Sequence, residues 1–259
     1  MIEKAAELIK NANHVTAFTG AGISVESGIP PFRGENGLWS KFDPVFLDIN
    51  YFHKYPLKSW KLIKEIFYDF FGKAKPNAAH FALAEMEKMG YTKAVITQNI
   101  DNLHQMAGSK EIYEFHGNSR NLVCTKCGLK FFVSEIGLNK LPPKCKECGG
   151  ILKPDFIFFG EPIPEPARSQ SFAETEKADV FILIGTTGEI MPASMIPYEA
   201  KNNDVKIIEV NTKSSNYTNS ITDIFLEGKA TEIMGELLGF LKEKYNGTFN
   251  KRDFSRKSF

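Results

Sequence analysis

The four cysteines are the residues whose spacing most directly predicts chemistry. They occur as two Cys-x2-Cys pairs, and all of them lie between residues 124 and 148 of a chain of 259 residues. Each pair can place two thiolates on one tight turn, and two such turns form a tetrahedral zinc site. Four thiolates leave no coordination position open for a substrate, so we expect a structural zinc. Its predicted ligands are Cys124, Cys127, Cys145 and Cys148.

Lysines in the same segment leave a second interpretation open, a zinc ribbon that binds nucleic acid. They are Lys126, Lys130, Lys140, Lys144 and Lys146. The whole chain has a net charge of only +1, however, which gives no general reason to expect such binding. We therefore do not expect nucleic acid as a partner.

A glycine turn near the N-terminus predicts an anion site. Residues 14–18 form a run typical of a short buried strand, and Gly20 and Gly22 then permit a tight turn into a helix that begins at Ala21. A helix start presents backbone N–H groups and the positive end of a dipole, which suits a pyrophosphate. The same turn also follows strands for purely structural reasons. Residues 31–34 add an aromatic ring and a cation to a loop that we expect to be mobile.

Polar or glycine-rich residues follow other predicted strands as well. In an open α/β sheet, ligands bind beyond the carboxyl ends of the strands, where these residues converge. Each one alone has a structural interpretation, such as a helix cap for Asn99 or core packing for His116. Together they favour a large polar ligand that contains phosphates and riboses. The converging groups are Gly20–Gly22, Gln98–Asp101, His116, Gly185–Thr187 and Asn211.

One part of the usual dinucleotide-binding pattern is missing. That pattern has an acidic residue about 20 residues after the glycine turn, where it binds a ribose. Asp43 lies near that distance but does not end a predicted strand. We expect Asn211 to supply the ribose contact instead.

The elements that would position these residues alternate between strand and helix. This alternation predicts an α/β fold with a Rossmann-like open parallel sheet and helices on both faces. The predicted strands span residues 14–18, 92–97, 111–115, 179–184, 205–210 and 224–226, and the predicted helices span residues 2–11, 57–71, 76–90, 166–177, 192–201 and 230–244.

Two segments depart from the alternation and predict a small inserted domain. Residues 36–75 are crowded with aromatic side chains and form a helical module, whereas residues 118–155 form the zinc ribbon, which is too short to hold a core without metal. The predicted Rossmann-like domain comprises residues 1–35, 76–117 and 156–245, and residues 246–259 are predicted to be a disordered tail.

The N-terminal residues do not predict a signal peptide, and no segment predicts a membrane span. Residues 1–10 have an amphipathic pattern that includes acids, and no apolar run reaches membrane-spanning length. We expect a soluble, cytoplasmic protein without a membrane partner.

The motifs together resemble the sirtuins, the silent-information-regulator family of NAD-dependent protein deacylases. The matching segments are Gly20–Gly34, Thr97–His104, His116-Gly117, the two cysteine pairs, Phe159–Glu161 and Gly185–Thr187. The resemblance implies a transferase or hydrolase reaction that removes an acyl group, most simply acetyl, from lysine. NAD is consumed as co-substrate, and the products are nicotinamide, O-acyl-ADP-ribose and free lysine. An NAD-dependent mono-ADP-ribosyltransferase on the same scaffold is the alternative.

The resemblance also implies a role for each residue of the site. His116 would be the general base that deprotonates a ribose hydroxyl, a task that suits imidazole, and Asn99 would be the second catalytic residue. The implied NAD-binding residues are Gly20, Ala21, Gly22, Ser24, Glu26, Pro31, Phe32, Arg33, Trp39, Gln98, Asn99, Ile100, Asp101, His116, Gly185, Thr186, Thr187, Asn211, Lys229 and Ala230.

The substrate peptide would add as a strand between two loops of the chain. The implied peptide-binding residues are Ile157, Phe159, Gly160, Glu161, Glu189 and Ile190. The sequence departs from the family at Thr187, where serine is more usual, and at Glu189, which could favour basic peptides or weaken strand addition. The Tyr-x-x-Arg pair of desuccinylases is also missing, since Tyr68 is followed by Phe71. This argues against acidic acyl groups, and the aromatic residues of 36–75 leave longer fatty acyl groups open.

Overall fold

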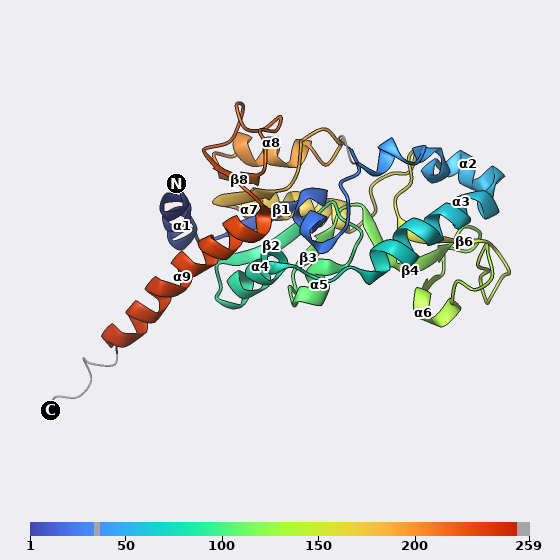
Figure 1. Ribbon diagram of the computed structural model, residues 1–259, viewed down its shortest axis with the longest axis horizontal. Helices are drawn as coiled ribbons and strands as arrows, with labels where there is room; N and C mark the ends of the chain where they lie inside the picture. The colour runs from blue at the N-terminus through green and yellow to red at the C-terminus, as the bar shows by residue number, and fades with distance from the viewer. Residues whose placement is uncertain (34–36, 253–259) are drawn as a thin grey trace.

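The structure is a computed structural model that describes the backbone of residues 1–33 and 37–252 and the side chains of residues 1–33 and 37–243. Its larger part is a six-stranded sheet in the order β3-β2-β1-β7-β8-β9, in which every pair of neighbours is parallel (Figure 1). The strands are β1 (Val15–Thr19), β2 (Thr92–Thr97), β3 (Ile112–Glu114), β7 (Val180–Ile184), β8 (Lys206–Asn211) and β9 (Ile224–Glu227). The predicted Rossmann-like parallel sheet is therefore confirmed.

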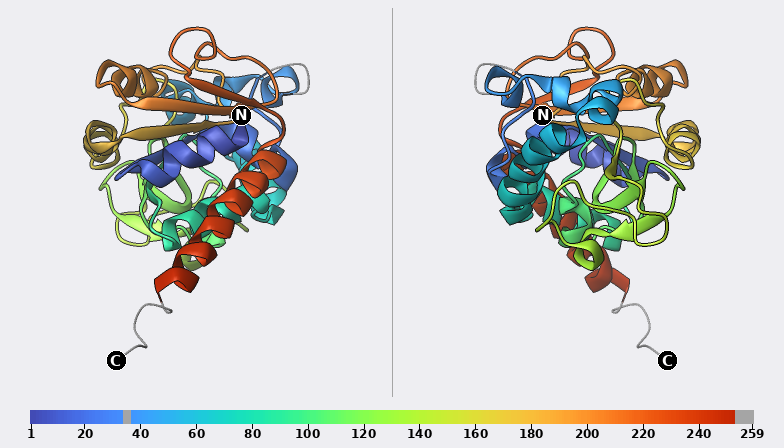
Figure 2. Two further views of the ribbon diagram at one scale, coloured as in Figure 1. Left: turned by 90° about the vertical axis from the view of Figure 1, so that its left-hand side faces the viewer. Right: turned by 90° about the vertical axis from the view of Figure 1, so that its right-hand side faces the viewer.

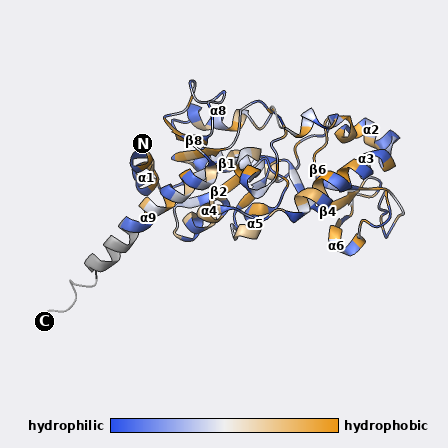
Figure 3. Ribbon diagram, in the orientation of Figure 1, coloured by the Kyte–Doolittle hydropathy of each residue, from blue (hydrophilic) through white to orange (hydrophobic). Residues whose placement is uncertain are grey.

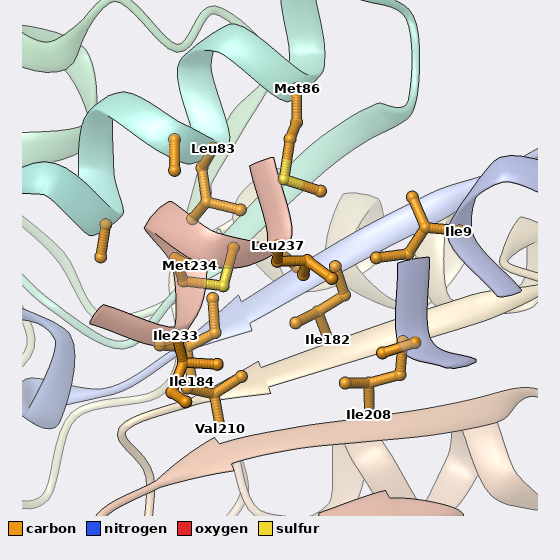
Figure 4. Packing of buried hydrophobic residues seen from close by; sticks show 14 of the residues in the cluster. Ile9, Leu83, Met86, Ile182, Ile184, Ile208, Val210, Ile233, Met234 and Leu237 are labelled. Carbon is orange, nitrogen blue, oxygen red and sulfur yellow. The ribbon is translucent and has the colours of Figure 1, made fainter. Parts of the chain in front are cut away.

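Helices cover both faces of this sheet, as predicted. Helices α1 (Ile2–Asn11), α4 (Ala78–Lys88) and α9 (Ala230–Arg252) share one core with the strands, in which Ile9, Leu83 and Leu237 lie against Ile182 and Ile208 (Figure 4). The opposite face, with Phe18 and Phe181, packs against α8 (Met195–Asn202) and Phe172 of α7 (Ala167–Lys177). Because alternate residues of β1 and β7 enter opposite cores, both strands are apolar throughout.

A second unit holds the aromatic segment and the cysteines (Figures 1 and 2). Its three-stranded antiparallel sheet has the order β5-β4-β6, formed by Lys130–Phe132, Gly117–Cys124 and Leu152–Phe156. Its helical part comprises η3 (Pro44–Leu47), α2 (Ile49–Lys54), α3 (Pro56–Ile63), η4 (Lys64–Phe70) and η5 (Phe71–Lys73), and α6 (Val133–Ile136) follows β5. Trp60 Nε1 donates to Leu152 O at 2.8 Å, and both parts share one apolar core, which confirms a small inserted unit.

The predicted helix over residues 57–71 is wrong in its interior. The α-helix ends at Ile63 and continues as a π-helix over Lys64–Phe70 and a 3-10 turn over Phe71–Lys73. The wider π turn still directs Ile66 and Phe67 into the core, with Phe67 against Phe71. Hydrophobic periodicity predicted the buried face, but it could not predict the change of helical pitch.

The end of the chain also differs from the prediction. Helix α9 continues to Arg252, so residues 246–252 are helical rather than disordered, while residues 253–259 lie outside the described part of the chain. The packed first turns of α9 supply the nucleus, and extending an existing helix costs little free energy per residue. Hydrophilic and hydrophobic residues mix along the helices (Figure 3), and none of the helices within the described residues is both long and apolar enough to cross a membrane.

Candidate active site

The glycine turn after β1 lies against the glycine turn after β7. Gly20 N donates to Ile184 O at 3.0 Å, and Gly22 N donates to Gly185 O at 2.8 Å. A Cβ at position 22 would lie 2.5 Å from Gly185 Cα, and Gly185 itself has a φ of +61°. Glycine is therefore required for the close approach of two backbones. This corrects one sequence argument, because these two glycine N–H groups are bonded within the protein and are not free for a phosphate.

Buried polar side chains converge directly beyond β1 and β2. Asn99 is 6% exposed, and its Nδ2 donates to Gly20 O at 3.1 Å and to Ser24 Oγ at 3.2 Å. Ser24 Oγ donates in turn to Asp101 Oδ2 at 2.7 Å, and Asp101 Oδ1 accepts from Leu103 N. Burial raises the pKa of Asp101, although these two hydrogen bonds lower it. Three residues predicted separately from sequence thus form one hydrogen-bonded chain.

A second set of contacts crosses the sheet towards β8. Gln98 Nε2 donates to Thr186 Oγ1 at 3.1 Å, and Asn211 Nδ2 donates to Thr186 O at 3.0 Å. The ends of β2, β7 and β8 are therefore tied together by predicted site residues. Asn211 lies at the end of β8, the position where the sequence predicted a ribose contact.

His116 is held with one ring nitrogen turned towards the backbone. Its Nδ1 lies 3.0 Å from Gln98 O. Because a carbonyl can only accept, Nδ1 is the protonated nitrogen and Nε2 keeps a lone pair. Burial lowers the pKa of His116, and the hydrogen bond to Gln98 partly opposes this change. The neutral imidazole is thus the dominant form near neutral pH, as a general base requires.

The loop after η1 (Ala21–Ser27) packs against the small unit. The rings of Phe32 and Trp39 lie 5.3 Å apart, and backbone bonds join Leu38 N to Pro31 O and Trp39 N to Phe32 O. Arg33 Nη1 lies 3.6 Å from Glu189 Oε2, with both side chains about half exposed. Residues 34–36, which include Gly34 of the predicted motif, lie outside the described residues.

Several of the residues that the resemblance implies for NAD binding meet at the start of α9. Glu26 Oε2 accepts from Thr231 Oγ1, and Lys229 Nζ lies 3.7 Å from Glu26 Oε1. Gly228 N donates to Asn211 O at 3.0 Å, which connects this turn to the end of β8. Ala230 is buried directly after Lys229.

The two loops predicted to hold a peptide are fixed by hydrogen bonds to different parts of the chain. Ile157 N donates to His116 O at 3.0 Å, while Phe159 exchanges backbone hydrogen bonds with Leu47 O and Ile49 N. The exposed side chain of Phe159 and the exposed Gly160 follow. On the other side, residues 187–190 rest on the segment after β8, where Asn216 N donates to Thr187 O at 3.1 Å.

Next to the Ile100–Asp101 turn lies a pocket of about 180 Å³ between the two units. Its lining comprises Phe67, Tyr68, Phe71, Gly72, Ala74, Ile100, Asp101, Asn102, Met106, Ser119 and Val133. The Tyr68 hydroxyl is buried and has no hydrogen-bond partner among the described residues. The pocket is therefore mainly apolar, with one unpaired phenol group.

The four cysteines form a separate cluster in the small unit. Their sulfur atoms all lie within 4.8 Å of one another, and the pairs Cys124–Cys148 and Cys127–Cys145 are 3.5 and 3.8 Å apart. A tetrahedron with zinc–sulfur distances of about 2.3 Å gives sulfur separations of about 3.8 Å, whereas a disulfide needs about 2.05 Å. A Cβ at Gly150 would lie 2.9 Å from Cys124 Sγ. The donor set and its spacing fit the predicted structural zinc.

Several polar residues outside the predicted site support it from behind. Thr19 Oγ1 bonds Thr97 Oγ1 and lies 3.0 Å from His104 Nε2, and His104 packs on His80 with ring centroids 4.9 Å apart. Burial lowers the pKa of His80 to about 4 and that of His104 to about 3. Sequence reasoning missed Lys153, a buried cation in β6. An isolated hydroxyl, imidazole or amine in an apolar run gives no sequence signal of such contacts.

The chain is similar to known proteins of one family. Residues 20–192 match the model of the Sir2 family. The chain is 45% identical to an NAD-dependent protein deacylase of Thermococcus sibiricus over 92% of its own length and 95% of that protein, and 42% identical to NAD-dependent protein deacetylase 1 of Pyrobaculum aerophilum over 93% and 95%. Among solved structures, a mutant Sir2 homologue in complex with ADP-ribose aligns with a TM-score of 0.90 and 39% identity, covering 95% of this chain and 98% of that one.

Proposed function

This chain belongs to the Sir2 family and is an NAD-dependent protein-lysine deacylase, and we propose that His116 and Asn99 are its catalytic residues. The single observation that best supports this assignment is the state of His116. Its Nδ1 is committed to Gln98 O, so that Nε2 is the nitrogen that can accept a proton. A positioned base of this kind contributes about 10²–10⁴-fold to a reaction rate.

We propose that the buried polar chain of Asn99, Ser24 and Asp101 orders the nicotinamide half of NAD. Asn99 keeps its amide oxygen available while its Nδ2 is bonded, and burial raises the pKa of Asp101 while its bonds to Leu103 N and Ser24 Oγ oppose that change. Gln98 and Ile100 complete this set. The protein's contribution here is orientation and exclusion of water. Pro31, Phe32, Arg33 and Trp39 would cover this half from the loop side.

The adenosine half of NAD would lie along the ends of β7 and β8. Thr186 and Asn211 are joined there by a hydrogen bond, and Glu26, Lys229 and Ala230 follow at the start of α9. Gly20, Ala21, Gly22, Gly185 and Thr187 form the backbone floor between the two halves. A solved Sir2 homologue in complex with NAD, 39% identical with a TM-score of 0.87, supports NAD as the ligand of this fold.

A peptide substrate would add its backbone between Phe159–Glu161 and Glu189–Ile190, with Ile157 and Phe159 beside the acylated lysine. A structure titled as Sir2 with a p53 peptide and NAD aligns with this chain at a TM-score of 0.84 and 30% identity. Because Glu189 lies within 3.6 Å of Arg33, its negative charge is partly compensated before a peptide arrives.

We further propose that the preferred acyl groups are uncharged. Phe67, Tyr68 and Phe71 line the pocket beside Ile100, and no lysine, arginine or histidine lies among the described residues around it. Asp101 in the same lining disfavours a second carboxylate. Acetyl fits this environment, and longer apolar chains could extend into the pocket.

The predicted domain boundaries and cellular context remain proposals based on the sequence. We propose a Rossmann-like NAD-binding domain of residues 1–35, 76–117 and 156–245, with residues 36–75 and 118–155 as the small domain. We also propose a cytoplasmic protein, and the net charge of +1 gives no general reason to expect nucleic acid as a partner.

The direct test of the assignment is nicotinamide release with NAD and an acetyl-lysine peptide. Wild-type protein should release nicotinamide only when the acyl peptide is present, and His116→Ala should reduce turnover by about 10²-fold or more. Peptide binding by His116→Ala, measured in parallel, controls for folding. Equal turnover in the variant would remove His116 from its proposed role.

A further inference from the structure

The ammonium group of Lys153 is buried against the turn that is proposed to hold the substrate peptide. The Lys153 side chain is 7% exposed, although it lies on β6 of the zinc-bearing unit. The ammonium lies 2.9 Å from Glu161 Oε2 and donates to Pro154 O and Phe156 O at 2.9 and 2.7 Å. It also lies 4.3 Å from the centroid of the Phe158 ring. Its polar partners in the described structure all belong to residues 154–161.

The same contacts determine the conformation of the turn. Glu161 Oε2, the atom that meets the ammonium, also accepts from Phe158 N at 2.7 Å. Glu161 N donates back to Phe158 O, and Gly160 between them has a φ of +93°. One carboxylate oxygen thus joins the ammonium to a backbone amide and closes the turn from the inside.

The turn is fixed to the rest of the site on both sides. Ile157 N donates to His116 O, next to the proposed base, and Phe159 N and O bond to Leu47 and Ile49. Removing the ammonium would leave a carboxylate that is 24% exposed without its cation, at the centre of these contacts. The expected consequence is a displaced Phe158–Glu161 turn rather than general unfolding.

A nearby ion pair provides a contrast. Lys130 Nζ lies 2.7 Å from Asp155 Oδ2 in the same small sheet, but the Lys130 side chain is 59% exposed. Lys153, by contrast, loses almost all its hydration, and burial lowers its pKa while Glu161 opposes that change. Burying this cation costs free energy, and the carbonyl and carboxylate oxygens of residues 154–161 compensate for that cost.

We propose that Lys153 is a positioning residue for substrate, which holds the Phe158–Glu161 turn in the shape that accepts the peptide backbone. This inference rests on the proposed peptide site. Lys153 thereby connects β6 to peptide affinity rather than to NAD binding. The adjacent residue of β6, Leu152, pairs with the zinc ligand Cys124.

The test compares the steady-state kinetics of wild-type protein, Lys153→Met, Lys153→Arg and the matched control Lys130→Met. Lys153→Met keeps the aliphatic volume but removes the charge. It should raise the KM for the acetyl peptide about tenfold or more while the KM for NAD stays within about twofold. Hydrogen exchange at the Phe158 and Phe159 amides should become faster. Lys153→Arg should recover most of the peptide affinity, and Lys130→Met should match wild type.

Two results would overturn the inference. One is a wild-type peptide KM in Lys153→Met, and the other is an equal increase of the peptide and NAD KM values, which indicates a general structural role. If Lys153→Met does not fold, Glu161→Gln replaces it, because glutamine keeps an acceptor for Phe158 N and should show the same selective increase. Failure of the proposed function is distinct, because wild-type protein itself would then show no nicotinamide release dependent on acyl peptide.

Discussion

At the scale of single residues, the proposed chemistry depends on one imidazole whose two nitrogens have different surroundings. Gln98 O accepts from His116 Nδ1, and this contact sets which nitrogen can accept a proton. Burial disfavours the charged form, so the pKa of His116 is lowered. The base is therefore present in its active, neutral form over a wider range of acidic pH than an exposed histidine would be.

We expect the rate of deacylation to reflect this lowered pKa. A free imidazole has a pKa of about 6.5, so an exposed base would lose half its activity near that pH. Because His116 stays neutral to lower pH, the pH at which kcat/KM falls to half its maximum should lie below 6.5. Profiles recorded with acetyl peptide at saturating NAD provide the check. A half-maximal rate above pH 6.5 contradicts the assigned environment.

A second residue prediction concerns Asn211. Its Nδ2 binds Thr186 O at the end of β7, and its carbonyl O accepts from Gly228 N. Asn211→Ala should raise the KM for NAD about tenfold, a loss of about 1.4 kcal/mol of binding free energy, and should leave the peptide KM unchanged. Asn203→Ala, which removes an exposed amide at the end of α8, serves as control. An unchanged KM for NAD would exclude the proposed ribose contact.

At the scale of elements, much of the architecture could be predicted from the sequence. The strand over residues 92–97 agrees with β2 (Thr92–Thr97) because an apolar, β-branched run between turns has few alternatives. The zinc cluster was predictable because its ligand spacing is local. The bonded state of Gly20 N and Gly22 N was not, since it arises from contact with Ile184 and Gly185, far away in sequence. Lys153 was not predictable for the same reason.

Zinc removal tests the role of the small sheet. Cys124 ends β4, Cys127 lies before β5, and Cys145 and Cys148 precede β6. The sheet shares its core with the helical module. Chelation should therefore lower the melting temperature and abolish deacylation, and added zinc should restore both. Metal content, circular dichroism and activity are measured on the same samples. Retained activity in fully zinc-free protein would contradict a structural role.

At the scale of the whole molecule, the site lies where two cores meet. Ile29, Ile100 and Leu103 extend from the loops of the large sheet into the core of the small unit. The large sheet thus supplies the polar strand ends, and the small unit supplies the apolar lining beside them. A junction between two units is a common place for a ligand pocket.

This junction predicts which acyl groups the enzyme removes. The pocket contains aromatic rings and Asp101 but no described cation, so kcat/KM for succinyl-lysine should be about 100-fold below that for acetyl-lysine. A myristoyl-lysine peptide should remain a substrate if its chain enters the pocket. A panel of the three peptides with identical sequence provides the comparison. Equal rates for succinyl and acetyl peptides would show that another residue neutralises the acid.

The central claim is that NAD is consumed to remove the acyl group, and the products of one reaction test it most directly. Mass spectrometry of a mixture of protein, NAD and acetyl-lysine peptide should show nicotinamide, O-acetyl-ADP-ribose and free-lysine peptide in equal amounts. ADP-ribose attached to protein or peptide, with the acetyl group retained, would contradict the account and support the ADP-ribosyltransferase alternative.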